Sequence, residues 1–181
     1  LALHLPPGGK DRLDHLAIVM SERPGFFEAA FSIHEYADGI AFRIGDMTVR
    51  PHPIGHYVPA WSMEITGPGG ERVIYAGDMG PAESVVGLAR GAELLILEAT
   101  LHTDEFDDLK RGHLTAEEAV DHAVRAGVPR AVLVHYPIER LEAIRAICAP
   151  TDGRVQPALS RMEIEVAAGG TPVITMPERR S

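Results

Sequence analysis

The sequence VIYAGDMGP, residues 73–81, decides the fold: an apolar run ends at a glycine and is followed at once by Asp78. The same pattern, an apolar run closed by an ionisable residue, occurs twice more, as LLILE at 94–98 and AVLVH at 131–135. Short strands that are apolar throughout are buried on both faces of a sheet. Open α/β sheets place their ligand sites at the carboxyl ends of such strands. We therefore expect Asp78, Glu98 and His135 to converge at one edge of a sheet.

A further candidate, after Asp78 and His135, is His56, in the sequence GHYVP that follows an expected strand over residues 47–54. Two imidazoles and a carboxylate from separate strand ends suit a borderline divalent ion such as zinc, and a carboxylate can bridge two ions. Each residue alone also fits a simpler role. Asp78 could cap a turn or a helix, and His135 could be a hydrogen-bonded core histidine.

The remaining pattern predicts one α/β domain over residues 1–181, because the length suits a single core. The first half favours a loop at 1–9, helices at 10–20 and 24–30, and strands at 31–36, 40–44, 47–54, 60–66 and 71–76. The second half alternates helices at 82–90, 115–126 and 138–148 with strands at 93–97, 130–134 and 162–166. Thr115 and Glu118 form a capping box at the start of the clearest helix. Such alternation indicates sheets covered by helices.

The charge balance disfavours RNA as a partner. The chain carries 26 acidic and 17 basic residues, a net charge of −9, and its arginines are scattered, whereas phosphate-backbone binding needs a basic face. The single cysteine, Cys148, allows no intrachain disulfide and is expected to be a small buried apolar residue, which favours a reducing, cytoplasmic location. The sequence contains no run of 18 apolar residues, so a membrane is not expected as a partner.

Five motifs in order give a family resemblance: HYVP at 56–59, YAGDMGP at 75–81, LEAT at 97–100, GHLTAEEA at 112–119 and HY at 135–136. The series resembles the metallo-β-lactamase superfamily, and within it is most similar to the ribonuclease Z and cyclic-nucleotide phosphodiesterase branch. The resemblance implies an αββα sandwich and a metal-dependent hydrolase with two divalent ions, expected to be zinc.

The resemblance also implies a role for each motif residue. His56 would hold one zinc, Asp78 would bridge both ions, and His135 would hold the second. Glu98 and His113 resemble the pair that lies beside the scissile phosphate in the ribonuclease Z branch, where the histidine orients the phosphate or protonates the leaving oxygen. A carboxylate partner fixes the tautomer of an imidazole and raises its basicity. His113 could instead be only a polar residue at a helix start.

One family motif, His-x-His-x-Asp-His, does not occur in these 181 residues. The nearest match, Asp14-His15, has no histidine two or four residues upstream. We therefore expect the chain to be the C-terminal portion of a longer domain, with a sandwich incomplete at its N-terminus, that alone binds metal weakly and is inactive. The other histidines are expected to be structural or solvent-facing: His4, His34, His52, His102 and His122.

Among substrates, a small phosphodiester such as a cyclic nucleotide is expected, with a homodimer as the assembly. A ribonuclease Z-like role in processing the 3′ end of transfer RNA is the main alternative. Against it, residues 15–56 show compact strands and no Gly/Lys/Arg-rich insertion that could hold transfer RNA, and the chain is acidic. A binding domain that has lost its metal, or a hydrolase of thioesters or lactams, is a further alternative, since one fold supports several chemistries.

Overall fold

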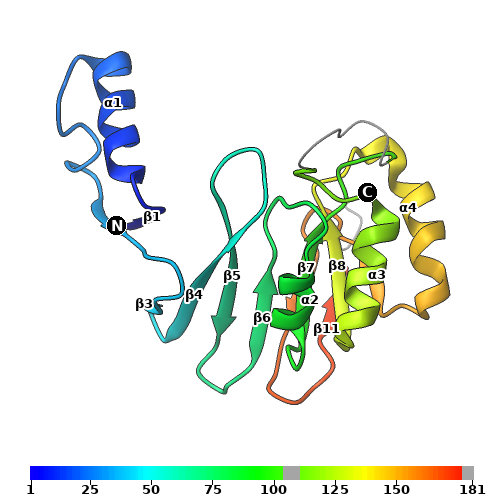
Figure 1. The fold of residues 1–181 in the computed structure, drawn as a ribbon. Coiled ribbons are helices and arrows are strands. Elements are labelled where there is room, and N and C mark those ends of the chain that lie inside the picture. The colour runs from blue at the N-terminus through cyan, green and yellow to red at the C-terminus, as the bar shows by residue number, and fades with distance from the viewer. Residues whose placement is uncertain (104–110, 177–181) are drawn as a thin grey trace, which may run out of the picture.

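A computed structural model describes residues 1–103 and 111–176, and its centre is a seven-stranded mixed sheet. Figure 1 shows how this sheet lies between the N-terminal segment and the helices. In spatial order the strands are β3 (Phe42–Ile44), β4 (Met47–Ile54), β5 (Ala60–Thr66), β6 (Arg72–Tyr75), β7 (Leu94–Glu98), β8 (Arg130–Val134) and β9 (Val155–Pro157). Neighbours from β3 to β6 are antiparallel, and neighbours from β6 to β9 are parallel.

These pairings give four strands the same direction. β4 and β6 both run antiparallel to β5, while β6, β7 and β8 are mutually parallel. The carboxyl ends of β4, β6, β7 and β8 therefore lie at one edge of the sheet. The segments that follow these strand ends carry the candidate residues.

Three helices, α2 (Glu83–Ala89), α3 (Ala116–Ala126) and α4 (Leu141–Cys148), cover one face of the sheet (Figure 1). Alternate residues of β6, β7 and β8 face them, and Ile74, Leu95 and Leu133 are fully buried there. The capping box of α3 is confirmed: Thr115 accepts from the backbone of Glu118, and the Glu118 side chain accepts from the backbone of Thr115. The expected mixed α/β class is confirmed as well.

The expectation that the apolar strands are buried on both faces holds for β7 and β8 and is wrong for β6. Leu94 and Val132, which point away from the helices, are 3% and 2% exposed, but Tyr75 on β6 is 42% exposed. β6 therefore presents one face to solvent. In the described part of the chain, none of the helices combines the length and apolar character needed to cross a membrane.

The N-terminal segment forms a small unit beside the β3 end of the sheet, away from α2–α4 (Figure 1). It contains α1 (Gly9–Ser21) and a parallel pair, β1 (Ala2–Leu5) and β2 (Ser32–Glu35). The His4 ring stacks on the Phe42 ring of β3, with 4.6 Å between ring centroids. The sequence prediction of a loop over 1–9 was therefore wrong for β1, because pairing with β2 supplies hydrogen bonds that local composition does not reveal.

Two other expected elements differ from the structure, and two short strands were not expected. Residues 24–30 form turns where a helix was expected, and Gly25 has a left-handed φ of 70° that interrupts helical geometry. The helix expected over 138–148 begins as a 3₁₀ turn, Ile138–Arg140, before α4. The strand expected last, β10 (Glu163–Glu165), pairs with a further strand, β11 (Val173–Thr175), and the three-residue β9 precedes both. β9 and β11 were not predicted, whereas the three-residue strands β3 and β10 each lie within a longer run that was.

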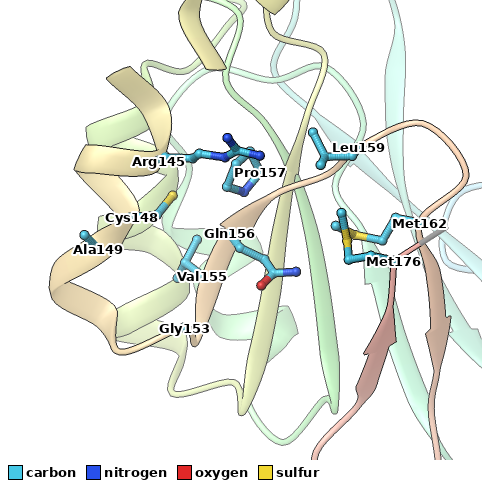
Figure 2. A pocket seen from close by; sticks show the side chains of 10 residues that line it. All are labelled: Arg145, Cys148, Ala149, Gly153, Val155, Gln156, Pro157, Leu159, Met162 and Met176. Atoms are coloured by element: carbon cyan, nitrogen blue, oxygen red, sulfur yellow. The ribbon is translucent and has the colours of Figure 1, made fainter. Parts of the chain in front are cut away.

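A cavity of about 270 Å³ lies between α4, β9 and the β10–β11 hairpin, as Figure 2 shows. Its lining includes Cys148, Met162 and Met176. Burial raises the pKa of the Cys148 thiol to about 11, so the thiol is neutral and unreactive at physiological pH. Cys148 is the buried apolar residue that its sequence context predicts.

Candidate metal and catalytic site

The candidate residues converge at the common edge of the strands. Asp78 follows β6, Glu98 ends β7, and His135 follows β8. Nδ1 of His135 lies 3.0 Å from Oδ1 of Asp78. Ligand atoms of Asp78, His113 and His135 all lie within 4.8 Å of one another. The expected convergence of the strand ends is confirmed.

Two tight backbone turns direct these side chains. Gly77 has φ 71°, and a Cβ there would lie 3.1 Å from the carbonyl oxygen of Trp61. His135 has φ 50°, which is uncommon for a residue with a side chain and is frequently found at functional sites. The Thr100 hydroxyl donates to the His135 carbonyl (2.9 Å) and stabilises this turn. The backbone thus holds His135 in an orientation that faces Asp78.

Glu98 is a buried carboxylate, 1% exposed, with three partners. Its Oε1 accepts from the Met79 N–H (2.8 Å) and lies 2.7 Å from Nδ1 of His113, and its Oε2 accepts from the Thr100 N–H (3.2 Å). Because both oxygens are engaged by protein donors, Glu98 is suited to orienting His113 and poorly placed to bind an ion. With Nδ1 protonated toward Glu98, Nε2 of His113 keeps its lone pair.

His56 adjoins this group without belonging to the Asp78–His113–His135 cluster. Its Nδ1 donates to the Gly112 carbonyl (2.6 Å), and its ring centroid lies 4.8 Å from that of His113. A backbone carbonyl that holds Nδ1–H is the usual partner of a metal-binding imidazole, because it leaves Nε2 free to coordinate. The family resemblance implied His56, Asp78 and His135 as ligands, whereas the geometry groups His113 with Asp78 and His135.

The donor set fits a divalent transition metal. It offers imidazole nitrogens and a carboxylate, the ligands that zinc takes in catalytic sites. The side chains of Asp78 and His135 are 39% and 52% exposed, so an ion held by them could be reached by a substrate.

The remaining candidates have other partners. His122 lies buried in α3, where Nδ1 donates to the Glu118 carbonyl (2.7 Å) and Nε2 accepts from the Ala82 N–H (3.1 Å), a structural role. His52 lies 3.1 Å from Glu64. Asp14, part of the nearest match to the family's histidine-rich motif, pairs with Lys10 across one turn of α1 (2.7 Å).

Sequence reasoning assigned no role to Thr100, which contacts both halves of the site. Its N–H donates to Glu98, and its hydroxyl lies 3.2 Å from Nδ1 of His135. A hydroxyl residue two positions after a buried strand-end glutamate is the signal that could have indicated it.

Comparisons with known proteins show which family the chain belongs to. Residues 2–136 match the family described as the Beta-lactamase superfamily domain. An uncharacterized protein of Mycobacterium tuberculosis is 32% identical over 144 residues, covering 77% of this chain and 52% of that protein. A ribonuclease Z of Methanothermobacter thermautotrophicus is 37% identical over 145 residues, covering 75% of this chain and 42% of that protein.

A solved structure shows the same fold. The metallo-β-lactamase fold protein YhfI of Bacillus subtilis superposes with a TM-score of 0.64 at 26% identity, over 72% of this chain and 53% of YhfI. The chain spans about half the length of the curated relatives it matches. The family match over most of the chain, the mixed sheet and the strand-edge cluster together establish that the chain belongs to the metallo-β-lactamase superfamily of hydrolases.

Proposed function

We propose that the chain belongs to a zinc-dependent phosphodiesterase that acts on a small phosphodiester such as a cyclic nucleotide. The observation that carries the proposal is the buried Glu98–His113 pair beside Asp78 and His135. An imidazole held by a buried carboxylate is suited to proton transfer, and here it lies within reach of a cluster able to hold metal.

In this proposal Asp78 would be shared by two ions, while His56 and His135 would each hold one. The chemistry that zinc would supply when bound there is a nucleophile at neutral pH, through a lowered pKa of water, and stabilisation of charge at phosphorus. The protein's part is to fix these ligands. Gly112 orients His56, and Thr100 together with Asp78 orients His135.

His113 has the proton-transfer role. Its Nδ1–H points at the buried Glu98 carboxylate, so a positive charge on the ring is stabilised and Nε2–H can donate a proton to the leaving oxygen. The same pairing lets the ring orient a phosphate oxygen. One ring nitrogen of His113 also lies within 4.8 Å of ligand atoms of Asp78 and His135, so a test must separate metal binding from proton transfer.

The main alternative substrate is precursor transfer RNA, favoured by the similarity to a ribonuclease Z. The net charge of −9 favours a small substrate. The deciding experiment supplies zinc to the complete gene product and measures hydrolysis of cyclic adenosine monophosphate and of a precursor transfer RNA. Turnover of the cyclic nucleotide alone supports the proposal, and turnover of the RNA alone contradicts it.

We further propose that the 181 residues alone bind zinc weakly and lack activity, since three expected ligands must serve two ions. Zinc analysis and turnover, measured on this chain and on the complete gene product, test this. Substantial zinc-dependent turnover by the 181 residues would contradict it, and an absence of metal from both proteins would favour a non-catalytic binding domain.

A cytoplasmic homodimer completes the proposal. One buried cysteine suits a reducing compartment. Light scattering of the complete gene product, coupled to size-exclusion chromatography, measures the assembly directly, and a monomer at micromolar concentration would contradict the dimer.

A further inference from the structure

A hollow beside His56 lies next to the cluster and has no part in the proposed chemistry. It is lined by residues 54–59, which connect β4 to β5, and by Arg111. His56 forms its border with the site, because the His56 ring is 4.8 Å from the ring of His113. A molecule whose phosphate lies at Asp78 and His135 could therefore extend directly into this hollow.

Tyr57 gives the hollow an aromatic wall. Tyr57 is 58% exposed, as is its apolar neighbour Val58, although both adjoin a polar site. The Tyr57 ring lies 5.6 Å from the His113 ring, and a Cβ on Gly112 would lie 2.7 Å from it. The absence of a side chain at Gly112 is what allows the ring to lie against the backbone there. Exposed aromatic surface at such a place is typical of a surface that binds a ring.

Arg111 gives the hollow a fixed set of hydrogen-bond donors. Its guanidinium pairs with Glu118, the residue that also completes the cap of α3, and the Arg111 side chain is only 17% exposed. A guanidinium presents five N–H donors and no acceptor, so it recognises acceptor atoms at the edge of a base or on a phosphate.

We propose that this hollow is the base-binding subsite, in which the nucleobase of the phosphodiester stacks on Tyr57 with an acceptor edge toward Arg111. The inference rests on the proposed function. It goes beyond that function by assigning the side of the Asp78–His113–His135 cluster on which the base lies. A second hollow, lined by His135, Ile138 and Ser160 on the opposite side, is the competing position.

The test compares two substrates that differ only in the base: adenosine 3′,5′-cyclic phosphate and ribose 3′,5′-cyclic phosphate. Tyr57→Ala in the zinc-loaded complete gene product should lower kcat/KM for the adenosine substrate by about 10-fold or more, the order expected for one base–aromatic stack. The value for the base-free substrate should stay within about twofold. Tyr57→Phe should restore the preference for the base.

Ile138→Ala is the matched control, because Ile138 is 67% exposed and lines the opposite hollow. It should change neither substrate selectively. Tyr57→Leu, which keeps bulk over Gly112 without an aromatic face, repeats the test if Tyr57→Ala does not fold. Binding of both substrates to metal-free protein, measured by calorimetry, should show the same base-dependent loss.

Equal loss on both substrates, or a base-dependent loss at Ile138, would overturn the subsite while leaving the proposed function intact. Wild-type protein that hydrolyses neither substrate would instead overturn the proposed function, and the subsite with it.

Discussion

Nδ1 of His113 lies 2.7 Å from Oε1 of Glu98, whose side chain is 1% exposed. A carboxylate buried to that extent is stable only with partners, and the N–H groups of Met79 and Thr100 complete the set. These residues come from three separate segments that follow β6 and β7 or precede α3. The pair therefore exists only in the folded protein, and it couples the stability of the strand edge to the orientation of one imidazole.

Replacing Glu98 by Gln should damage both stability and activity. One amide oxygen cannot accept from all three donors, and the amide NH₂ would face an N–H. We expect the free energy of unfolding to fall by about 1–3 kcal/mol, and activity to fall on the order of 10–100-fold. Urea denaturation and kcat measure the two effects. Glu117→Gln, on the exposed side of α3, is the control and should change neither; an equally mild effect at Glu98 would argue against the pair.

Substituting His113 and substituting His56 should have different effects on zinc binding. If His113 transfers protons, His113→Ala keeps the zinc content of the complete gene product and lowers kcat by about 10²–10⁴-fold. His56→Ala should lose bound zinc. Metal analysis by atomic emission reads the stoichiometry. Loss of zinc with His113→Ala and its retention with His56→Ala would assign His113, the residue within 4.8 Å of Asp78 and His135, as the ligand.

Thr100 should act as a positioning residue. Thr100→Val keeps the shape but removes the hydroxyl that donates to the His135 carbonyl, at a cost of about 1 kcal/mol in stability. We expect a several-fold fall in kcat/KM that Thr100→Ser, which retains the hydroxyl, restores. Thr171→Val, on an exposed segment, is the control. A serine variant as impaired as the valine variant would indicate that packing matters and the hydroxyl does not.

Cys148 should make the fold sensitive to alkaline pH. Its pKa is raised to about 11 by burial, so as pH rises above the ordinary value of about 8.5 the unfolded thiol ionises first. The stability that the neutral Cys148 thiol contributes is therefore fully present below about pH 8.5 and is lost as the pH rises toward 11. Urea titrations at pH 7.5 and pH 10 should show a smaller decline for Cys148→Ala than for the unaltered chain. An identical decline would mean that other groups cause it.

The central strands and the site edge could be predicted from the sequence because their signals are local. An apolar run followed by Asp78, Glu98 or His135 indicates a buried strand with a polar end, and parallel strand ends must meet. The partners of each side chain depend on segments far apart in sequence, so neither the Gly112 carbonyl at His56 nor the Thr100 hydroxyl at His135 could be predicted. β1 and β9 were missed for a related reason, since both are short and are defined by a neighbouring strand.

The most direct test of the metal site is diffraction at the zinc absorption edge, from crystals of the complete gene product grown with zinc. We predict an anomalous peak about 2.0–2.2 Å from a carboxylate oxygen of Asp78 and from an imidazole nitrogen of His135. Zinc bound only elsewhere, with no peak between Asp78 and His135, would contradict the account.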